Sequence, residues 1–254
     1  MKLKDWLKEY RADFNDRDLR FLLKHSLGKD DSELERICKA YAQGMPLAYI
    51  LGKEEFFGYE FDISPDVLIP RPETELIVEK AIELVNTQDL SSVLDLCCGS
   101  GNIAIAIKNS LSRDLSIVAS DCSLEALKVA ELNAKKHKVN INFIQTDLLT
   151  GFERNSFDLI VSNPPYVEDE AIGGTLNYEP RAALSGGSDG LGVIKKILKQ
   201  AKGCLRNEGY LIIEIGYKHK NILDEYINRL NSYEIVESIK DYSGHFRGIV
   251  LKNR

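Results

Sequence analysis

Apolar residues recur at helical spacing along roughly the first fifty positions of the chain. Three sets share this spacing: Trp6, Leu7 and Tyr10; then Leu19, Leu22 and Leu23; then Leu34, Ile37 and Tyr41. Because residues three or four apart lie on one face of a helix, each set predicts a helix with one buried side. Ser32 and Glu35 have the spacing of a capping box and predict the start of the third helix. We expect these helices to form a small bundle.

The pattern changes after Gly44-Met45-Pro46, a sequence that breaks a helix. Residues 54–63 then alternate apolar and polar side chains, and a period of two is typical of half-buried strands. We interpret this stretch as a β-hairpin.

From Glu73 onward, helical and strand patterns alternate. Strands are predicted near residues 92–96, 116–120, 141–145, 157–162, 209–215, 233–238 and 248–252. Helices are predicted near residues 73–85, 103–110, 123–137, 191–205 and 218–230. Such alternation implies βαβ units, hence an α/β fold with a mostly parallel seven-stranded sheet and helices on both faces. The expected division is a helical bundle at 1–53, a β-hairpin linker at 54–72 and an α/β domain at 73–254.

The segment Asn163-Pro164-Pro165-Tyr166 carries the clearest chemical signal. It follows an apolar run at 157–162, so it lies where a strand ends and a loop opens. Two prolines fix the backbone and remove two N–H donors, which leaves the Asn amide and nearby carbonyls as acceptors. Such an edge can hold a planar –NH2 group by its hydrogens and aim the nitrogen at an electrophile. Because Asn-Pro also starts ordinary turns, a rigid turn without chemistry is the alternative.

A glycine turn follows the predicted strand at 92–96 and runs directly into a helix. Gly99 and Gly101 allow a sharp turn and let a ligand approach the main chain, while the helix start offers free N–H groups. The next predicted strand ends in Asp121, whose carboxylate can accept both hydroxyls of a ribose. The pattern indicates a nucleoside-cofactor site, and its expected residues are Asp95, Cys97, Cys98, Gly99, Ser100, Gly101 and Asp121.

Two cofactor classes fit this pattern. Gly99-x-Gly101-x-x-Ala104, with Asp121 about twenty residues on, matches the dinucleotide fingerprint of NAD enzymes. Asp95, however, lies just before the glycines, where it would repel a pyrophosphate and could help to bind the ammonium group of a methionine moiety. Asn163-Pro164-Pro165-Tyr166 has no evident task in hydride transfer but an obvious one in methyl transfer to nitrogen. The sequence therefore favours S-adenosylmethionine over NAD.

The composition describes an ordinary globular protein, with 44% hydrophobic and 28% charged residues among 254. The opening segment alternates charges, unlike a signal peptide, and no apolar run approaches the length of a membrane span. The five cysteines show no framework spacing, so we expect reduced thiols in a cytoplasmic protein. Cys97 and Cys98 are adjacent, but small residues in a tight loop explain them better than redox chemistry does.

Histidine usage and charge narrow the range of ligands. The four histidines are scattered, so no metal site is expected. The formal net charge is −6 and no conspicuous basic run is present, whereas binding to duplex DNA draws on cationic contacts to phosphates. A protein or small-molecule substrate is favoured over nucleic acid.

Several motifs together carry a family resemblance. The glycine loop at 95–101 combined with Asn163-Pro164-Pro165-Tyr166 resembles class I, Rossmann-like amino-methyltransferases. The segments at 68–75 (LIPRPETE), 179–184 (EPRAAL) and 186–191 (GGSDGL) narrow this to the release factor glutamine methyltransferases, the PrmC/HemK family. The resemblance covers essentially the whole chain. Two departures are Cys98, where a threonine is common, and the segment at 244–247, which varies and receives no role.

The resemblance implies an activity, a cofactor and a partner. Members of this family use S-adenosylmethionine to methylate the side-chain amide of the glutamine in the Gly-Gly-Gln loop of peptide chain release factors. The residues expected to carry catalysis are Asn163, Pro164, Pro165 and Tyr166, and Asn163 is also expected to contact the cofactor. The Asn163 side-chain oxygen and the Pro164 carbonyl would accept the two N–H groups, and Tyr166 would pack on the amide plane. Asp147 and Leu148 are expected near the adenine, although a solvated carboxylate at a strand end is the alternative for Asp147.

The sequence leaves the roles of several other motif residues undecided. Arg71 is either an exposed side chain without a task or part of the rim that receives the substrate loop. Glu179, Arg181 and the Gly186-Gly187 pair are expected to shape a loop over the site, and Glu214 could be structural. The helical region at 1–53 is expected to recognise the release factor. No membrane or nucleic-acid partner is expected, and the protein is expected to be a monomer.

Two rival functions are compatible with parts of the sequence. An adenine-N6 DNA or RNA methyltransferase uses the same Asn-Pro-Pro-Tyr logic on a flipped base. The acidic balance and the lack of room for a separate target-recognition domain speak against it. A non-catalytic S-adenosylmethionine-binding module is the rival from another class. The intact Asn163-Pro164-Pro165-Tyr166 beside an intact glycine loop speaks against that.

Overall fold

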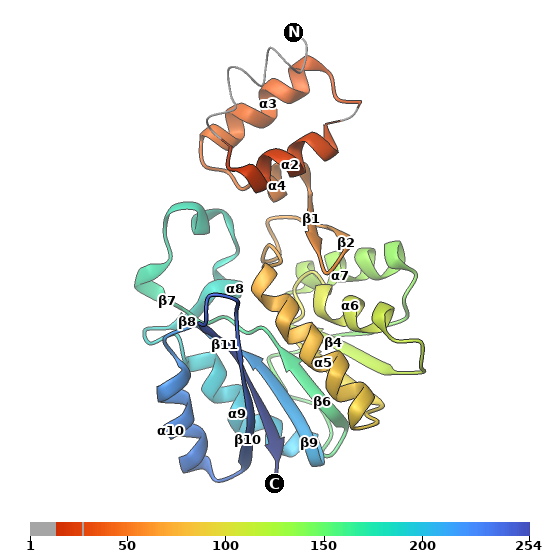
Figure 1. Cartoon of the computed structure of the whole chain (residues 1–254), viewed down its shortest axis with the longest axis vertical. Coiled ribbons are helices and arrows are strands. Elements are labelled where there is room, and N and C mark those ends of the chain that lie inside the picture. Colours follow the sequence, from red (N-terminus) through yellow and green to blue (C-terminus); the bar gives the residue numbers. More distant parts are fainter. Residues whose placement is uncertain (1–13, 27) are drawn as a thin grey trace.

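The computed structural model describes residues 14–26 and 28–254. The expected helix around Trp6, Leu7 and Tyr10 lies outside these residues. Three helices follow: α2 (Asp16–His25), α3 (Asp31–Ala42) and α4 (Leu47–Leu51). They share a small hydrophobic core of their own, in which the two predicted stripes meet; its buried members are Phe14, Leu19, Leu22, Leu34, Ile37, Cys38 and Leu47. Figure 1 shows this helical region apart from the α/β body.

The predicted capping box at the start of α3 is wrong. The N-cap is Asp30, whose Oδ1 accepts a hydrogen bond from the Glu33 N–H at 2.9 Å. Ser32 lies inside the helix, and its hydroxyl donates to the same Asp30 oxygen at 2.6 Å. A carboxylate interacts more strongly than a hydroxyl with the positive end of a helix, so the helix begins two residues earlier than a cap at Ser32 would set it.

A two-stranded hairpin joins the helical region to the α/β body, as the alternating pattern predicts. Strands β1 (Lys53–Phe56) and β2 (Tyr59–Asp62) are antiparallel, with Phe56 opposite Tyr59. The two turn residues both have positive φ, 52° at Phe57 and 76° at Gly58. This is the geometry of the tight turns whose twist matches that of paired strands.

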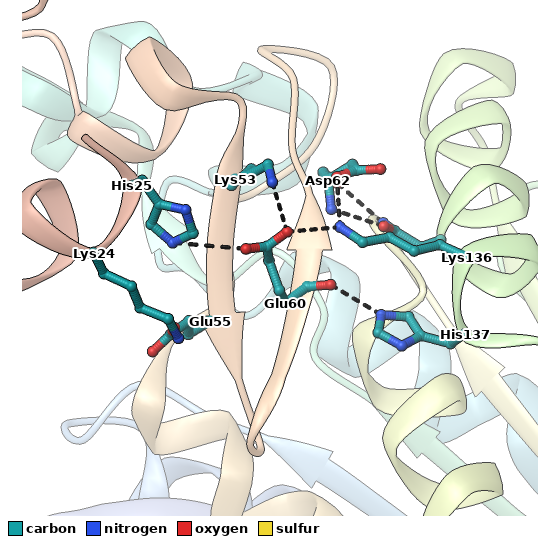
Figure 2. A network of polar contacts seen from close by, with 9 residues as sticks. Lys24, His25, Lys53, Glu55, Glu60, Asp62, Lys136 and His137 are labelled. Atoms are coloured by element: carbon teal, nitrogen blue, oxygen red, sulfur yellow. Dashed lines mark hydrogen bonds and ion pairs between the residues drawn. The ribbon is translucent and has the colours of Figure 1, made fainter. Parts of the chain in front are cut away.

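A polar network ties the hairpin to both of its neighbours, and Figure 2 shows its side chains converging on Glu60 of β2. Glu60 Oε1 accepts from Lys53 Nζ of β1 at 2.7 Å and from Lys136 Nζ of the helix α7 (Leu124–His137) at 3.1 Å. Its Oε2 lies 3.6 Å from His25 Nε2 of α2, and its carbonyl lies 2.9 Å from His137 Nε2 of α7. One carboxylate thus links three parts of the chain.

The α/β body is built on a seven-stranded sheet of order β10-β11-β9-β6-β3-β4-β5. Its strands are β3 (Ser92–Leu96), β4 (Ser116–Asp121), β5 (Asn142–Gln145), β6 (Phe157–Ser162), β9 (Leu205–Glu214), β10 (Tyr233–Lys240) and β11 (Phe246–Asn253). Only β11 runs antiparallel to its two neighbours. Its longer helices are α5 (Glu75–Thr87), α6 (Asn102–Ser110), α7 (Leu124–His137), α9 (Gly192–Cys204) and α10 (Lys220–Leu230). The predicted α/β fold with a mostly parallel sheet is confirmed.

The central strands β3, β6 and β9 bury both of their faces, one against each helical layer, whereas the edge strands β5 and β10 are partly exposed. Along β6, Leu159 and Val161 belong to the core shared with α5, α6 and α7, and Ile160 belongs to the core shared with α9 and α10. Successive strand side chains point to opposite faces, so an uninterrupted apolar run is what such a doubly covered strand requires. Figure 1 shows the two helical layers on either side of the sheet.

The segment between β6 and α9 holds short elements that the sequence did not predict. They are β7 (Val167–Glu168), η3 (Asp169–Ala171), η4 (Gly174–Tyr178), α8 (Arg181–Leu184) and β8 (Ser185–Gly187). These elements span two to five residues each, and none forms a continuous hydrophobic stripe that would have marked it. Strand β9 also begins at Leu205, earlier than the predicted 209. No helix within residues 14–26 and 28–254 is long and apolar enough to cross a bilayer.

Candidate active site

The connection order of the sheet creates a crevice at the ends of its central strands. From β3 the chain builds outward through β4 and β5, then returns to place β6 on the other side of β3. Ligands of open α/β sheets bind beyond the carboxyl ends of the strands at such a switch point. A cavity lies there, and its wall includes residues 97–100 after β3, 120–123 at the end of β4, 146–148 after β5, and Asn163 and Pro165 after β6.

Two glycines shape the loop between β3 and α6 for different reasons. Gly101 caps α6 with φ 77°, and a Cβ there would lie 3.1 Å from Ala130 Cβ of α7. Gly99 has φ 52°, and a Cβ there would meet nothing within 4 Å. Gly101 is therefore needed for close helix packing, whereas Gly99 is needed for its backbone conformation beside open space.

The two cysteines of this loop act through the backbone. Cys97 holds a left-handed conformation with φ 63°, and the Cys98 N–H donates to the Ser120 carbonyl of β4 at 3.0 Å. Burial, followed by the nearby carboxylates, raises the pKa of both thiols, so they stay protonated. A protonated thiol is a poor nucleophile and a poor redox centre. A backbone role also fits the replacement of the usual threonine by Cys98.

Asp121 fixes the loop and still has free acceptor capacity. Its Oδ2 accepts from the Gly99 N–H at 3.0 Å and its Oδ1 from the Ser123 N–H at 2.9 Å. A carboxylate offers about four acceptor positions, so two remain. Asp121 lines the cavity, so ribose hydroxyls could donate to its oxygens there. Ribose binding by Asp121 stays a prediction.

Asp95 occupies a different position from the one that its place in the sequence suggested. It is fully buried, is not among the residues lining the cavity, and accepts the Ala104 N–H of α6 at 2.9 Å through Oδ2. Burial raises its pKa to about 7, and its Oδ1 finds no hydrogen-bond partner among the described residues. Asp95 supports the glycine loop from behind, and its predicted contact with a methionine ammonium group remains a prediction.

The remaining wall of the cavity has an apolar character suited to a flat ring. Thr146, Asp147 and Leu148 follow β5, and Leu148 is held at φ 50°. Ile103 of α6 and Val193 of α9 add apolar surface to the same cavity. An adenine can be sandwiched by such side chains, and the predicted position of Asp147 and Leu148 near it is compatible with this wall.

Asn163 reaches the cavity with its amide oriented by a neighbour. Its Nδ2 donates to Thr74 Oγ1 at 3.1 Å, and its Oδ1 accepts no side-chain hydrogen bond from the described residues. Pro165 also lines the cavity, whereas Pro164 is buried and not part of the lining. The Tyr166 hydroxyl donates to Glu214 Oε1 at 2.9 Å. The structure therefore brings Asn163 and Pro165 to the cavity and turns the Tyr166 hydroxyl toward β9.

Thr74 is a site residue that sequence reasoning missed. It lies in the short helix η2 (Pro72–Thr74), is 1% exposed, and lines the cavity. Its hydroxyl donates to Glu214 Oε2 at 2.7 Å. Thr74 is 89 positions from Asn163 and 140 from Glu214, so no local pattern could have joined the three.

The rim holds an ion pair between two residues whose roles the sequence left open. Arg71 pairs with Glu179, whose Oε2 also accepts the Ile69 N–H at 3.1 Å. Glu179 is 7% exposed, so this pair fastens the segment before η2 to the loop after β7. The Tyr178 hydroxyl donates to the Gln43 carbonyl at 3.2 Å and joins the same loop to the helical region.

Two other motif residues have supporting positions. Arg181 pairs with Asp169 at 3.3 Å on the surface. A Cβ at Gly186 would lie 2.4 Å from the Gly190 carbonyl oxygen, so this turn accepts only glycine. No group of three or more His, Cys, Asp or Glu suited to a metal ion occurs among residues 14–26 and 28–254.

Comparisons with known proteins agree with this geometry. The sequence signature of the "Methyltransferase small domain" matches residues 74–179. The release factor glutamine methyltransferase of Fusobacterium nucleatum is 35% identical over 246 residues, which cover 94% of this chain and 69% of the relative. That of Haemophilus influenzae is 32% identical, with 97% of each chain covered.

A solved structure shares the fold. The E. cuniculi Mtq2–Trm112 complex, described as responsible for methylation of the eRF1 translation termination factor, has a chain that superposes with a TM-score of 0.53. Sequence identity there is 20%, and the match covers 74% of this chain and 99% of that one. This likeness concerns the fold alone. The two bacterial relatives show more than the fold, because each is more than 30% identical to this chain over more than nine tenths of its length. The chain therefore belongs to the release factor glutamine methyltransferase family.

Proposed function

We propose that this enzyme transfers a methyl group from S-adenosylmethionine to the side-chain amide nitrogen of the glutamine in the Gly-Gly-Gln loop of peptide chain release factors. The observation that carries the proposal is the orientation of Asn163. The Asn163 Nδ2 donates a hydrogen bond to Thr74 Oγ1 at 3.1 Å, which leaves the Asn163 Oδ1 to accept an N–H group in the cavity. The amide of a substrate glutamine offers such a group.

The cavity also fits the cofactor of this family, S-adenosylmethionine. The free acceptor positions of Asp121 suit a ribose, the backbone beside Gly99 is open to a close approach, and the apolar side chains of Ile103 and Leu148 suit an adenine. The Oδ1 of buried Asp95, behind the loop, has no hydrogen-bond partner among the described residues. S-adenosylmethionine, when bound, supplies an electrophilic methyl group.

The residues of this chain supply positioning. An amide nitrogen is a poor nucleophile because its lone pair is delocalised into the carbonyl. Asn163 Oδ1 can accept one of its N–H bonds in the cavity. We keep the Pro164 carbonyl as the acceptor for the second, although Pro164 is buried and does not line the cavity. Together these acceptors would hold the nitrogen in line and favour pyramidalisation as the new bond forms. Alignment of this kind can lower a barrier by about 7–11 kcal/mol. Burial raises the pKa of Tyr166, so its hydroxyl stays neutral and donates to Glu214.

The helical region provides surface for a large partner, and we assign release factor docking to it. A cleft runs from this region to the rim of the site, lined by Arg17 of α2 and Met45 on one side and by Arg71 and Leu176 on the other. The helical region therefore borders the approach to Asn163. Action in the cytoplasm, as a monomer and without binding nucleic acid, belongs to the same proposal.

The rival functions receive less support. A nucleic-acid methyltransferase gains much of its affinity for its substrate from cationic contacts to the phosphates, whereas the net charge of this chain is −6. A binding module without catalysis has no use for an amide held with its oxygen free beside a cofactor cavity.

One assay tests the proposal. The protein is incubated with methyl-labelled S-adenosylmethionine and either intact release factor, a release factor whose loop glutamine is replaced by alanine, or adenine-containing DNA. Label should enter only the intact release factor. Asn163→Ala should bind S-adenosylmethionine normally and transfer the label at least ~10²-fold more slowly, the scale for losing one essential polar contact. Label in DNA, or transfer to the alanine-substituted factor at the same rate, would refute the proposed substrate.

A further inference from the structure

A buried carboxylate stands behind Asn163 and is not part of the cavity wall. Glu214 ends β9, the strand next to β6, and is 1% exposed. The register pairs Ile213 with Ser162, so Glu214 and Asn163 leave the sheet side by side. Glu214 Oε2 accepts the Thr74 hydroxyl at 2.7 Å, and Oε1 accepts the Tyr166 hydroxyl at 2.9 Å.

The chemistry of these groups fixes the direction of every hydrogen bond. An ionised carboxylate can only accept, so both hydroxyls must donate to Glu214. The single proton of the Thr74 hydroxyl is then committed, and its oxygen can only accept from Asn163. An asparagine amide that donates to Thr74 through Nδ2 must present Oδ1 on its other side. The ionised form of Glu214 therefore determines which end of the Asn163 amide faces the cavity.

We propose that Glu214 is a positioning residue for methyl transfer, which acts through the Thr74 hydroxyl to hold Asn163 with its oxygen toward the substrate amide. This inference rests on the proposed function, because it concerns how Asn163 presents an acceptor to a substrate N–H group. Glu214 itself touches neither substrate nor cofactor. Tyr166 occupies the second carboxylate oxygen and keeps Glu214 in place.

Protonation of Glu214 would remove this control. A neutral carboxyl can donate to Thr74 Oγ1, which frees the Thr74 proton to bond Asn163 Oδ1 after the amide turns over. The turned amide presents –NH2 to the substrate –NH2, and two donors cannot bond each other. The substrate amide then loses its acceptor.

The surroundings of Glu214 bring this titration near neutral pH. Burial raises its pKa to about 7, against the lowering effect of the Thr74 and Tyr166 hydrogen bonds. Among charged groups, Glu73 of η2 raises the pKa and Arg247 of β11 lowers it. The rate of methyl transfer should therefore fall as the pH drops through about 7.

The test compares three variants with the wild type. Glu214→Gln keeps the shape but can donate to Thr74, Thr74→Val keeps the shape without a hydroxyl, and Thr74→Ser restores the hydroxyl. Glu234→Gln, an exposed position on β10, is the matched control. The measurements are kcat and KM with intact release factor from about pH 6 to about pH 8.5, and the dissociation constant of S-adenosylmethionine by calorimetry.

We expect Glu214→Gln and Thr74→Val to lower kcat by roughly 10²-fold with the cofactor dissociation constant unchanged. Thr74→Ser should recover most of what Thr74→Val loses. The wild type and Glu234→Gln should lose kcat below about pH 7, and Glu214→Gln should show no such limb. Wild-type kcat in both Glu214→Gln and Thr74→Val overturns the proposal. The proposal is also overturned if both variants lose affinity for S-adenosylmethionine by as large a factor as they lose kcat, because Glu214 would then be structural.

Two further measurements keep the outcome decisive. If Glu214→Gln fails to fold, the Thr74→Val and Thr74→Ser pair decides alone. If the wild type methylates no release factor, the proposed function fails, and the orientation is judged by NMR of the Asn163 side-chain amide. Its –NH2 resonances should shift with pH near 7 in the wild type and not in Glu214→Gln. Resonances that are insensitive to pH in both proteins overturn the proposed control.

Discussion

At the scale of single residues, Asp121 combines two tasks. It holds the glycine loop through the Gly99 N–H and begins the turn into α7 through the Ser123 N–H. Asp121 also lines the cavity, so Asp121→Ala should weaken S-adenosylmethionine binding by roughly tenfold or more, since each lost 1.4 kcal/mol is tenfold. Calorimetry measures this.

Asp121→Asn is the matched control for that change. It keeps an oxygen for one N–H group but loses acceptor capacity, so its binding should fall between the wild type and Asp121→Ala. Unchanged affinity in both variants would remove Asp121 from the cofactor site. Selective binding of NADH by the wild type would contradict the cofactor assignment altogether.

At the scale of elements, α7 links the hairpin to the cofactor loop through one buried side chain. Asn133 Nδ2 donates to the Asp62 carbonyl of β2 and to the Ser100 carbonyl of the glycine loop, both at 3.0 Å. Its Oδ1 accepts the Asp62 N–H at 2.8 Å. Asn133 therefore holds β2 and the glycine loop, which lie far apart in the sequence, to the same helix.

Asn133→Ala should lower the free energy of unfolding by about 2–4 kcal/mol, because it leaves buried backbone groups of Asp62 and Ser100 without partners. It should also weaken S-adenosylmethionine binding, since Ser100 lies in the cavity wall. Denaturant unfolding and calorimetry give the two values. Asn140→Ala, an exposed change just beyond α7, should alter neither. Equal stability of the two variants would show that the Asn133 link is unimportant.

The hairpin belongs with the catalytic core, which defines how the helical region should be removed. Phe56 and Phe61 of the hairpin are buried in the core shared with α5, α6 and α7, and Ala48 of α4 joins it. The helices before Pro46 pack on a separate core. Deleting residues 1–46 therefore removes the proposed docking region while leaving the hairpin in place, although it cuts the Tyr178 contact with Gln43.

This truncation should spare S-adenosylmethionine binding and slow methylation of intact release factor by roughly tenfold or more, because a loss of about 1.4 kcal/mol of docking free energy has that effect. A short Gly-Gly-Gln peptide, which cannot use the helical region, should be affected much less. Cofactor binding measured on the same sample controls for misfolding. Full activity on intact release factor would assign the helices a stabilising role instead.

At the scale of the whole molecule, two buried carboxyl groups couple folding to pH. Burial raises the pKa of both Asp95 and Glu214 to about 7, above the ordinary values near 4. The folded state therefore binds these protons more tightly than the unfolded state. The stability that each contributes is complete at acid pH and is lost as the pH rises through about 7.

Asp95→Asn and Glu214→Gln should each remove one of these contributions. Between about pH 6 and about pH 8, the wild type should lose about 1 kcal/mol of unfolding free energy relative to either variant. Histidines such as His25 and His219, whose pKa values burial lowers, cancel from this difference because they are common to both proteins. Thermal or denaturant unfolding at several pH values provides the data. A difference that is constant with pH would contradict the raised pKa values.

The sequence by itself determined what rests on local periodicity and short motifs. Apolar runs and alternating segments gave the seven strands and the hairpin, because strands buried on both faces and half-buried strands differ in their period. The glycine loop and Asn163-Pro164-Pro165-Tyr166 indicated a methyltransferase. The segments at 68–75, 179–184 and 186–191 indicated its family, which the relatives confirm. These features lie within short stretches of chain, where neighbouring residues set the geometry.

Only the tertiary structure decided how distant segments complete the site. Thr74 reaches Asn163 across 89 positions and Glu214 across 140, and Arg71 reaches Glu179 across 108. The tertiary structure also placed Asp95 behind the glycine loop, although the position of Asp95 in the sequence suggested the cavity wall. Hydrogen bonds of this kind form because packing buries polar groups that then require partners, and the sequence alone carries no record of which groups meet.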